Sequence, residues 1–169
     1  MKTLLIIILA IHIFFTSISF AGQCELIKLD VDFIREHKDS NTIYLNKNER
    51  KKYRIRVNYK GQILDSRGRI LDTRLLPNGT AMFVYSKDGI IYLSTKRSIT
   101  KFTHSSLVAG EDVVVAGMMN IERGRVNFIN DVSPRYVTKK EGNLKAALYR
   151  LKVMGVDTSK TRLFFQFNY

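Results

Sequence analysis

The chain has 169 residues, a single cysteine and a formal net charge of +13. This length suits one domain with one hydrophobic core, and a lone cysteine excludes an internal disulfide. The positive charge favours contact with acidic surfaces such as lipid headgroups, nucleic acid or acidic proteins.

The first 21 residues predict a secretory signal peptide. Met1-Lys2 is basic, Leu4 to Phe15 is almost wholly apolar, and Ser19-Phe20-Ala21 places small residues before a cleavage site. The apolar run is too short for a transmembrane helix, which needs about 20 residues. We therefore expect residues 1–21 to be removed and residues 22–169 to form a single β-rich domain. That domain would be secreted or periplasmic, with no transmembrane segment after cleavage.

The next part of the chain predicts short strands joined by turns. The expected segments are Glu25 to Phe33 (a strand or an ordered arm), Tyr53 to Tyr59, Gln62 to Asp65, Arg69 to Asp72, Thr80 to Ser86 and Ile90 to Thr95. Lys87-Asp88-Gly89 joins the last two and is a strong hairpin signal, because Gly89 can adopt a positive φ.

Basic residues alternate with apolar ones in the segment from Tyr53 to Tyr59. Such alternation indicates a half-buried strand with a basic outer face. Arg54, Arg56 and Lys60, together with Arg135 further along, are the expected binding residues for an acidic partner. The plainer alternative is a solvated strand face. We do not expect nucleic acid as a partner, because an exported protein meets little of it.

The C-terminal half predicts a second hairpin and one helix. Asp112 to Ile121 and Arg125 to Ile129 flank Glu122-Arg123-Gly124. Thr138 precedes Glu141 at capping-box spacing, and an apolar stripe follows at helical spacing. This stripe consists of Leu144, Leu148, Leu151 and Met154. We expect Gly155 to end the helix as a C-cap. The segment from Arg162 to Phe167 predicts a last strand.

The fold class predicted from these signals is α+β and β-rich. Antiparallel hairpins would form one sheet or a partly open barrel, with one C-terminal amphipathic helix.

The stretch KFTHSSLVAG, residues 101–110, could carry chemistry. The candidate catalytic residues are His104, Ser105, Ser106 and Tyr136. A serine nucleophile needs a base within hydrogen-bond reach, and neighbours on a strand point to opposite faces, so His104 is poorly placed to serve Ser105. The favoured interpretation is a strand end followed by a bend, where these polar groups bond to the backbone. We expect no metal, because too few histidines and cysteines remain to build a zinc site, and no cofactor.

The order of these segments resembles the conserved region of the plant IQ-motif calmodulin-binding proteins. The resemblance spans Leu45 to Thr161. Similar modules occur at the C-termini of some bacterial secreted toxin-like proteins. Its sharpest part is the family pattern HSSFLxG, a spacer, AG and SGHYxP. This chain supplies His104, Ser105, Ser106, Gly110, Ala116, Gly117, Ser133 and Tyr136.

The chain departs from the family where Pro134-Arg135 replaces Gly-His and Thr138 replaces proline. The sequence shows no IQ helix, so calmodulin binding is not implied. The family resemblance points to interaction proteins more than to enzymes. We therefore expect a secreted basic binding or effector module that recognises an acidic protein or another acidic surface. The alternative is a small secreted enzyme or toxin with a site around His104 and Tyr136.

Overall fold

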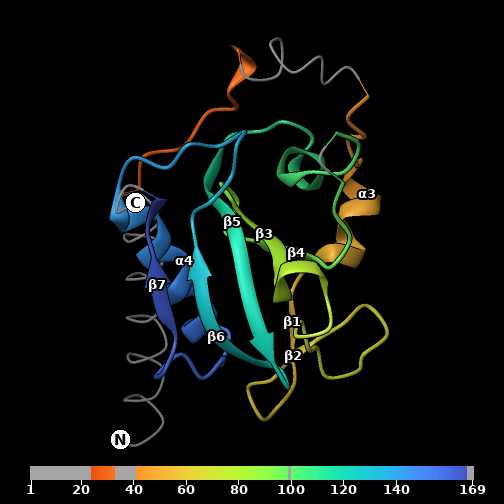
Figure 1. Ribbon diagram of the computed structural model, residues 1–169, viewed down its shortest axis with the longest axis vertical. Helices are drawn as coiled ribbons and strands as arrows, with labels where there is room; N and C mark the ends of the chain where they lie inside the picture. Colours follow the sequence, from red (N-terminus) through yellow and green to blue (C-terminus); the bar gives the residue numbers. More distant parts are fainter. Residues whose placement is uncertain (1–23, 33–40, 99, 167–169) are drawn as a thin grey trace, which may run out of the picture.

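The structure of the protein, a computed structural model, describes residues 24–32, 41–98 and 100–166 (Figure 1). The predicted signal peptide lies outside the described residues. In the part of the chain that is described, no helix has the length and apolar character needed to cross a membrane.

The main sheet has five strands in the order β4-β3-β5-β6-β7. They are β3 (Ala81–Ser86), β4 (Ile91–Ser94), β5 (Val113–Glu122), β6 (Arg125–Asn130) and β7 (Arg162–Phe164). Both predicted hairpins are confirmed, because β3 pairs with β4 and β5 with β6 in antiparallel register. In the two turns Gly89 and Gly124 adopt φ values of 76° and 80°. Residues that carry a side chain disfavour such positive φ values, whereas glycine adopts them readily. The sheet is open, so the fold is α+β and β-rich as expected, without a barrel.

The last strand joins the sheet in a way that hairpin signals do not predict. β7 pairs with β6 in parallel, with Phe128 opposite Arg162. A parallel pair needs a crossover connection, and the helix α4 (Glu141–Val153) supplies it.

The predicted start of α4 is wrong, whereas its end is confirmed. Lys140 is the N-cap and makes no side-chain capping bond. Thr138 is instead buried two residues earlier, and its hydroxyl has no hydrogen-bond partner among the described residues. At the other end Gly155 has a φ of 88° and its N–H donates to the carbonyl of Lys152 at 2.9 Å. The next N–H, of Val156, reaches back to the carbonyl of Leu151 at 3.1 Å, which completes a Schellman motif.

The segments before β3 form smaller elements than predicted. They are α3 (Lys47–Arg50), the 3₁₀ turns η1 (Lys51–Tyr53) and η2 (Pro77–Gly79), and the two-residue strands β1 (Arg56–Val57) and β2 (Ile63–Leu64). The strand predicted over Tyr53 to Tyr59 shrinks to β1, because η1 takes up its first residue. Two other predicted strands make only single bridges, Leu64 with Ile70 and Ile27 with Val113.

The sheet is covered on both faces, so its central strands are buried on both sides. Every residue of β3 is buried, and its side chains alternate between two hydrophobic clusters. Phe83 packs in the cluster that contains Leu144 and Leu151 of α4. Val84 packs in the opposite cluster with Leu107. Figure 1 shows α4 beside β6 and β7, and α3 beyond β4 at the other edge of the sheet.

Candidate functional site

The histidine–serine stretch folds into the 3₁₀ helix η3 (His104–Val108). The predicted strand end is therefore wrong. The N–H of Thr103 donates to Ser106 Oγ at 3.0 Å, and the N–H of Ser106 donates to the Thr103 carbonyl at 3.0 Å. These reciprocal bonds tighten the turn, and Ala109 ends it with a φ of 52°. Hydrogen bonds between side chains and the nearby backbone stabilise this turn, in place of the predicted strand end.

His104 is held at both ring nitrogens. Nε2 lies 3.0 Å from the carbonyl oxygen of Gly117, and Nδ1 lies 3.2 Å from Ser133 Oγ. A carbonyl only accepts, so Nε2 carries the ring proton and Nδ1 accepts from the serine hydroxyl. His104 is only 7% exposed. Burial lowers the pKa of His104 to about 4, against the opposing effect of its bond to Gly117. The imidazole is therefore neutral at pH 7.

The contact between Ser133 and His104 is a serine–base pair that reasoning from strand alternation missed. Its only sequence signal was the family pattern, in which both residues are matched. Ser133 is fully buried and His104 nearly so. A nucleophile must reach its substrate in a concave, accessible site. The pair therefore has the distances of a catalytic dyad but not the access.

The other candidate catalytic residues are also internal. Ser105 Oγ lies 3.0 Å from Thr103 Oγ1, and both are buried. The hydroxyl of the fully buried Tyr136 donates to the backbone oxygen of Glu111 at 3.0 Å. Burial raises the pKa of Tyr136, so it stays a neutral donor. We call this group the His104 cluster, and its members are Thr103, His104, Ser105, Ser106, Ser133 and Tyr136.

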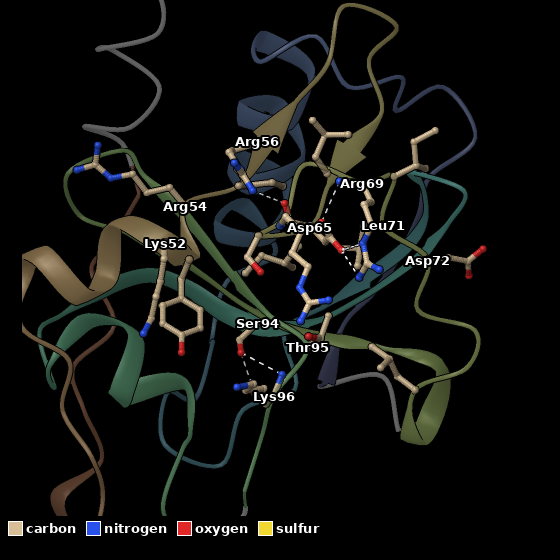
Figure 2. A pocket seen from close by; sticks show the side chains of 18 residues that line it. Lys52, Arg54, Arg56, Asp65, Arg69, Leu71, Asp72, Ser94, Thr95 and Lys96 are labelled. Carbon is tan, nitrogen blue, oxygen red and sulfur yellow. Dashed lines mark hydrogen bonds and ion pairs between the residues drawn. The ribbon is translucent and has the colours of Figure 1, made fainter.

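The second site is an open cavity of about 700 Å³ between the β1–β2 hairpin, the loop after β2 and the end of β4 (Figure 2). We call it the basic pocket. Its charged lining consists of Lys52, Arg54, Arg56, Arg67, Arg69 and Lys96, with Asp65 and Asp72 as the only carboxylates among its lining residues. Figure 2 shows Arg56 and Arg69 gathered around Asp65, with Ser94, Thr95 and Lys96 on the opposite side.

Both carboxylates of the basic pocket are already occupied by nearby partners. Asp65 accepts from the backbone N–H groups of Arg67 and Arg69 at 2.8 and 2.9 Å, and it forms an ion pair with the Arg69 guanidinium at 2.8 Å. These bonds hold the pKa of Asp65 below its usual range, and the bond from the backbone N–H of Arg69 has the largest effect. Asp72 is bound by Arg74 at 2.7 Å, which likewise lowers the pKa of Asp72. Neither carboxylate is available to the remaining cations.

Several pocket cations have no carboxylate within ion-pair distance in the described parts of the chain. Arg54, Arg67 and Lys96 make no such pair, and Arg56 donates to the backbone carbonyl of Asp65. The Lys52 ammonium lies 5.3 Å from the Tyr53 ring centre, a contact that leaves its charge in place. The basic pocket therefore carries an uncompensated positive charge.

The structure brings together only two of the four predicted binding residues. Arg54 and Arg56 line the basic pocket. Lys60 lies in the β1–β2 turn, with its ammonium 5.5 Å from the Tyr59 ring centre. Arg135 is only 4% exposed beside the buried Tyr136. The sequence reasoning also missed Arg67, Arg69 and Lys96. The available signal was the density of arginine, which recurs at positions 54, 56, 67, 69 and 74.

These features define a β-rich α+β domain with a sealed polar cluster and an open basic pocket. Residues 49–143 match the family described as IQ motif-containing protein middle domain. This match covers more than half of the chain, so the chain belongs to that family. It includes the whole basic pocket and the whole His104 cluster. No curated protein and no solved structure matches the chain. The expected resemblance to IQ-motif proteins is thus confirmed, and the likeness to bacterial toxin-like modules stays a prediction.

Proposed function

We propose that the protein is an exported basic binding or effector module that recognises an acidic partner through the basic pocket, without catalysis. The observation that carries this proposal is the uncompensated charge around a cavity of about 700 Å³. Six basic side chains line it, and the two carboxylates present are held by Arg69 and Arg74. A cleft lined by one sign of charge concentrates ligands of the opposite sign and speeds their association.

The partner we propose is a protein or another acidic surface met outside the cell. Nucleic acid is disfavoured by this location. Calmodulin is not implied, because the family match is to a middle domain and the sequence shows no IQ helix. A relation to toxin-like modules is compatible with export but is not needed for the proposal. Mass spectrometry of the exported protein should find Gly22 as its first residue, and a retained Met1 would contradict export by cleavage.

The alternative function, a small secreted enzyme, has one observation in its favour. Ser133 and His104 lie 3.2 Å apart with the proton placement that a serine nucleophile requires. Their burial argues against turnover. A His104→Ala protein that melts at the same temperature as wild type and loses only its activity would favour the enzyme.

The test of the binding proposal uses the exported protein and a fluorescent polyglutamate peptide, with anisotropy as the readout. We expect binding that weakens with added salt and that drops about tenfold in an Arg54→Gln/Arg56→Gln variant, equivalent to about 1.4 kcal/mol. The matched control is Arg125→Gln/Lys152→Gln, which removes the same charge from exposed positions outside the pocket. Equal losses in both variants would show diffuse attraction and would refute a role for the pocket.

A further inference from the structure

We infer that the ligand group recognised by the basic pocket is a phosphate, carried on a soluble molecule of nucleotide size. This inference rests on the proposed function: it keeps the basic pocket and its acidic ligand, and it replaces the protein or acidic surface proposed there by a soluble phosphorylated molecule. Three properties of the pocket lead to it, namely the amount of free charge, the nature of its walls and the way its cations are fixed.

The amount of free charge exceeds what one carboxylate can neutralise. Arg54, Arg67 and Lys96 make no ion pair with any described residue, and the Lys52 ammonium lies over the Tyr53 ring and likewise pairs with no described carboxylate. A phosphate monoester carries close to two negative charges at neutral pH and three acceptor oxygens, and a diphosphate carries more. Guanidinium groups also bind phosphate oxygens in pairs, a geometry that lysine-rich surfaces lack. Guanidinium binds a carboxylate in the same paired way, so the amount of unpaired charge in the pocket is what favours a phosphate over a single carboxylate.

The size and walls of the pocket suit a phosphate with an apolar or planar body attached. Small-molecule sites have volumes of roughly 300–1,000 Å³ and are lined by apolar side chains with a few polar groups. The basic pocket, at about 700 Å³, falls within this range of volume; its lining is mostly charged and polar, and Leu64, Leu71 and Leu93 add apolar walls. Tyr53 adds aromatic surface, and its ring is packed 5.5 Å from that of Phe102. A bare inorganic anion would leave this apolar surface unused.

The cations are carried on segments that are fixed before any ligand arrives. Ser94 Oγ donates to the carbonyl of Lys96 at 2.8 Å and accepts from its N–H at 3.1 Å, which sets the turn after β4. On the other side Asp65 anchors the backbone of Arg67 and Arg69. A preformed site loses less entropy on binding, so its charge contributes more fully to affinity.

The experiment is titration calorimetry of the exported protein with three soluble probes: ADP, inorganic pyrophosphate and adenosine. We expect ADP to bind most tightly, pyrophosphate about tenfold more weakly, and adenosine not measurably. Vesicles of phosphatidic acid in phosphatidylcholine form a fourth arm, because a lipid headgroup offers the same phosphate chemistry. Binding to those vesicles without binding to ADP or pyrophosphate would overturn the soluble ligand in favour of a membrane source.

Variants locate the site. Arg67→Gln/Lys96→Gln should weaken ADP binding at least tenfold, whereas the matched surface control Arg125→Gln/Lys152→Gln should change it less than twofold. Equal losses would place the phosphate elsewhere and overturn the inference. If polyglutamate binds through the pocket while ADP and pyrophosphate do not, the inference fails and the proposed function stands. If none of these anions binds, both fail together.

Discussion

The His104 cluster and the basic pocket are both rich in polar side chains, and they differ in where those side chains find their partners. In the cluster, His104, Ser105 and Ser106 bond to other buried groups, and the buried hydroxyl of Tyr136 donates to the backbone oxygen of the half-buried Glu111. In the pocket, Arg69 and Arg74 hold the two carboxylates, and the other cations form no ion pair with a carboxylate in the described part of the chain. A buried polar group that lacks a hydrogen-bond partner inside the protein destabilises the fold, whereas an exposed charge is solvated by water and stays available to a ligand. The difference separates residues that stabilise the fold from residues that can bind.

The cluster also explains why the family pattern joins residues that are distant in sequence. The carbonyl of Gly117 on β5 and the hydroxyl of Ser133 after β6 converge on His104 of η3. The imidazole thus ties together η3, β5 and the segment after β6. A family pattern of histidine and serine residues can therefore reflect hydrogen bonds that stabilise the fold as readily as it can reflect an active site.

The largest effect should come from His104→Ala. It deprives both the Gly117 carbonyl and the Ser133 hydroxyl of a partner, and each buried group left unsatisfied costs about 1–3 kcal/mol. We therefore expect a loss of about 2–6 kcal/mol in the free energy of unfolding, measured by urea denaturation. Anion binding, measured below the melting temperature, should be unchanged. A loss of binding with full stability would reverse the roles of the two regions.

Acid should weaken the cluster through the same histidine. The folded pKa of His104 is about 4, below its ordinary value of 6.5. Between these values the unfolded chain binds more protons, so stability is fully present above pH 6.5 and is lost as the pH falls toward 4. The full contribution is about 3 kcal/mol. Urea melts of wild type and His104→Gln at pH 7.5 and pH 4.5 should show their stability gap shrinking at the lower pH, and a constant gap would contradict a buried neutral imidazole.

Gly117 should tolerate no side chain, in contrast to a glycine of α4. A Cβ on Gly117 would lie 1.9 Å from the backbone oxygen of Asn130. We expect Gly117→Ala to cost about 1–3 kcal/mol or more through forced backbone shifts. Gly142→Ala is the matched control, because nothing lies within 4 Å of that Cβ. In a helix it should stabilise by about 0.5–1 kcal/mol. Thermal melts that ranked these two variants equally would contradict the close packing at β5.

The smallest effect on stability should come from the pocket. Arg67→Gln removes an exposed charge that has no ion-pair partner among the described residues, so the free energy of unfolding should change by less than about 0.5 kcal/mol. Its effect should appear in the salt dependence of anion binding, which should become shallower as one cation is lost. A variant that unfolds easily would show that Arg67 supports the fold and would blur the distinction between the two regions.

The sequence by itself determined the local features of this protein. Gly89 and Gly124 marked both hairpin turns, because a positive φ is a property of the residue and its immediate neighbours. Gly155 marked the end of α4 for the same reason. The apolar periodicity found the helix, and Leu144 and Leu151 of the predicted stripe are fully buried.

Only the tertiary structure decided the rest. The parallel pairing of β7 depends on how α4 crosses the sheet, and the same strand signal fits either direction. Thr138 had capping-box spacing, but packing buried it before the helix began. The contact of Ser133 with His104 and the gathering of Arg54, Arg67 and Lys96 join residues about 13 to 42 positions apart. Such contacts depend on long-range chain geometry, which local propensity does not encode.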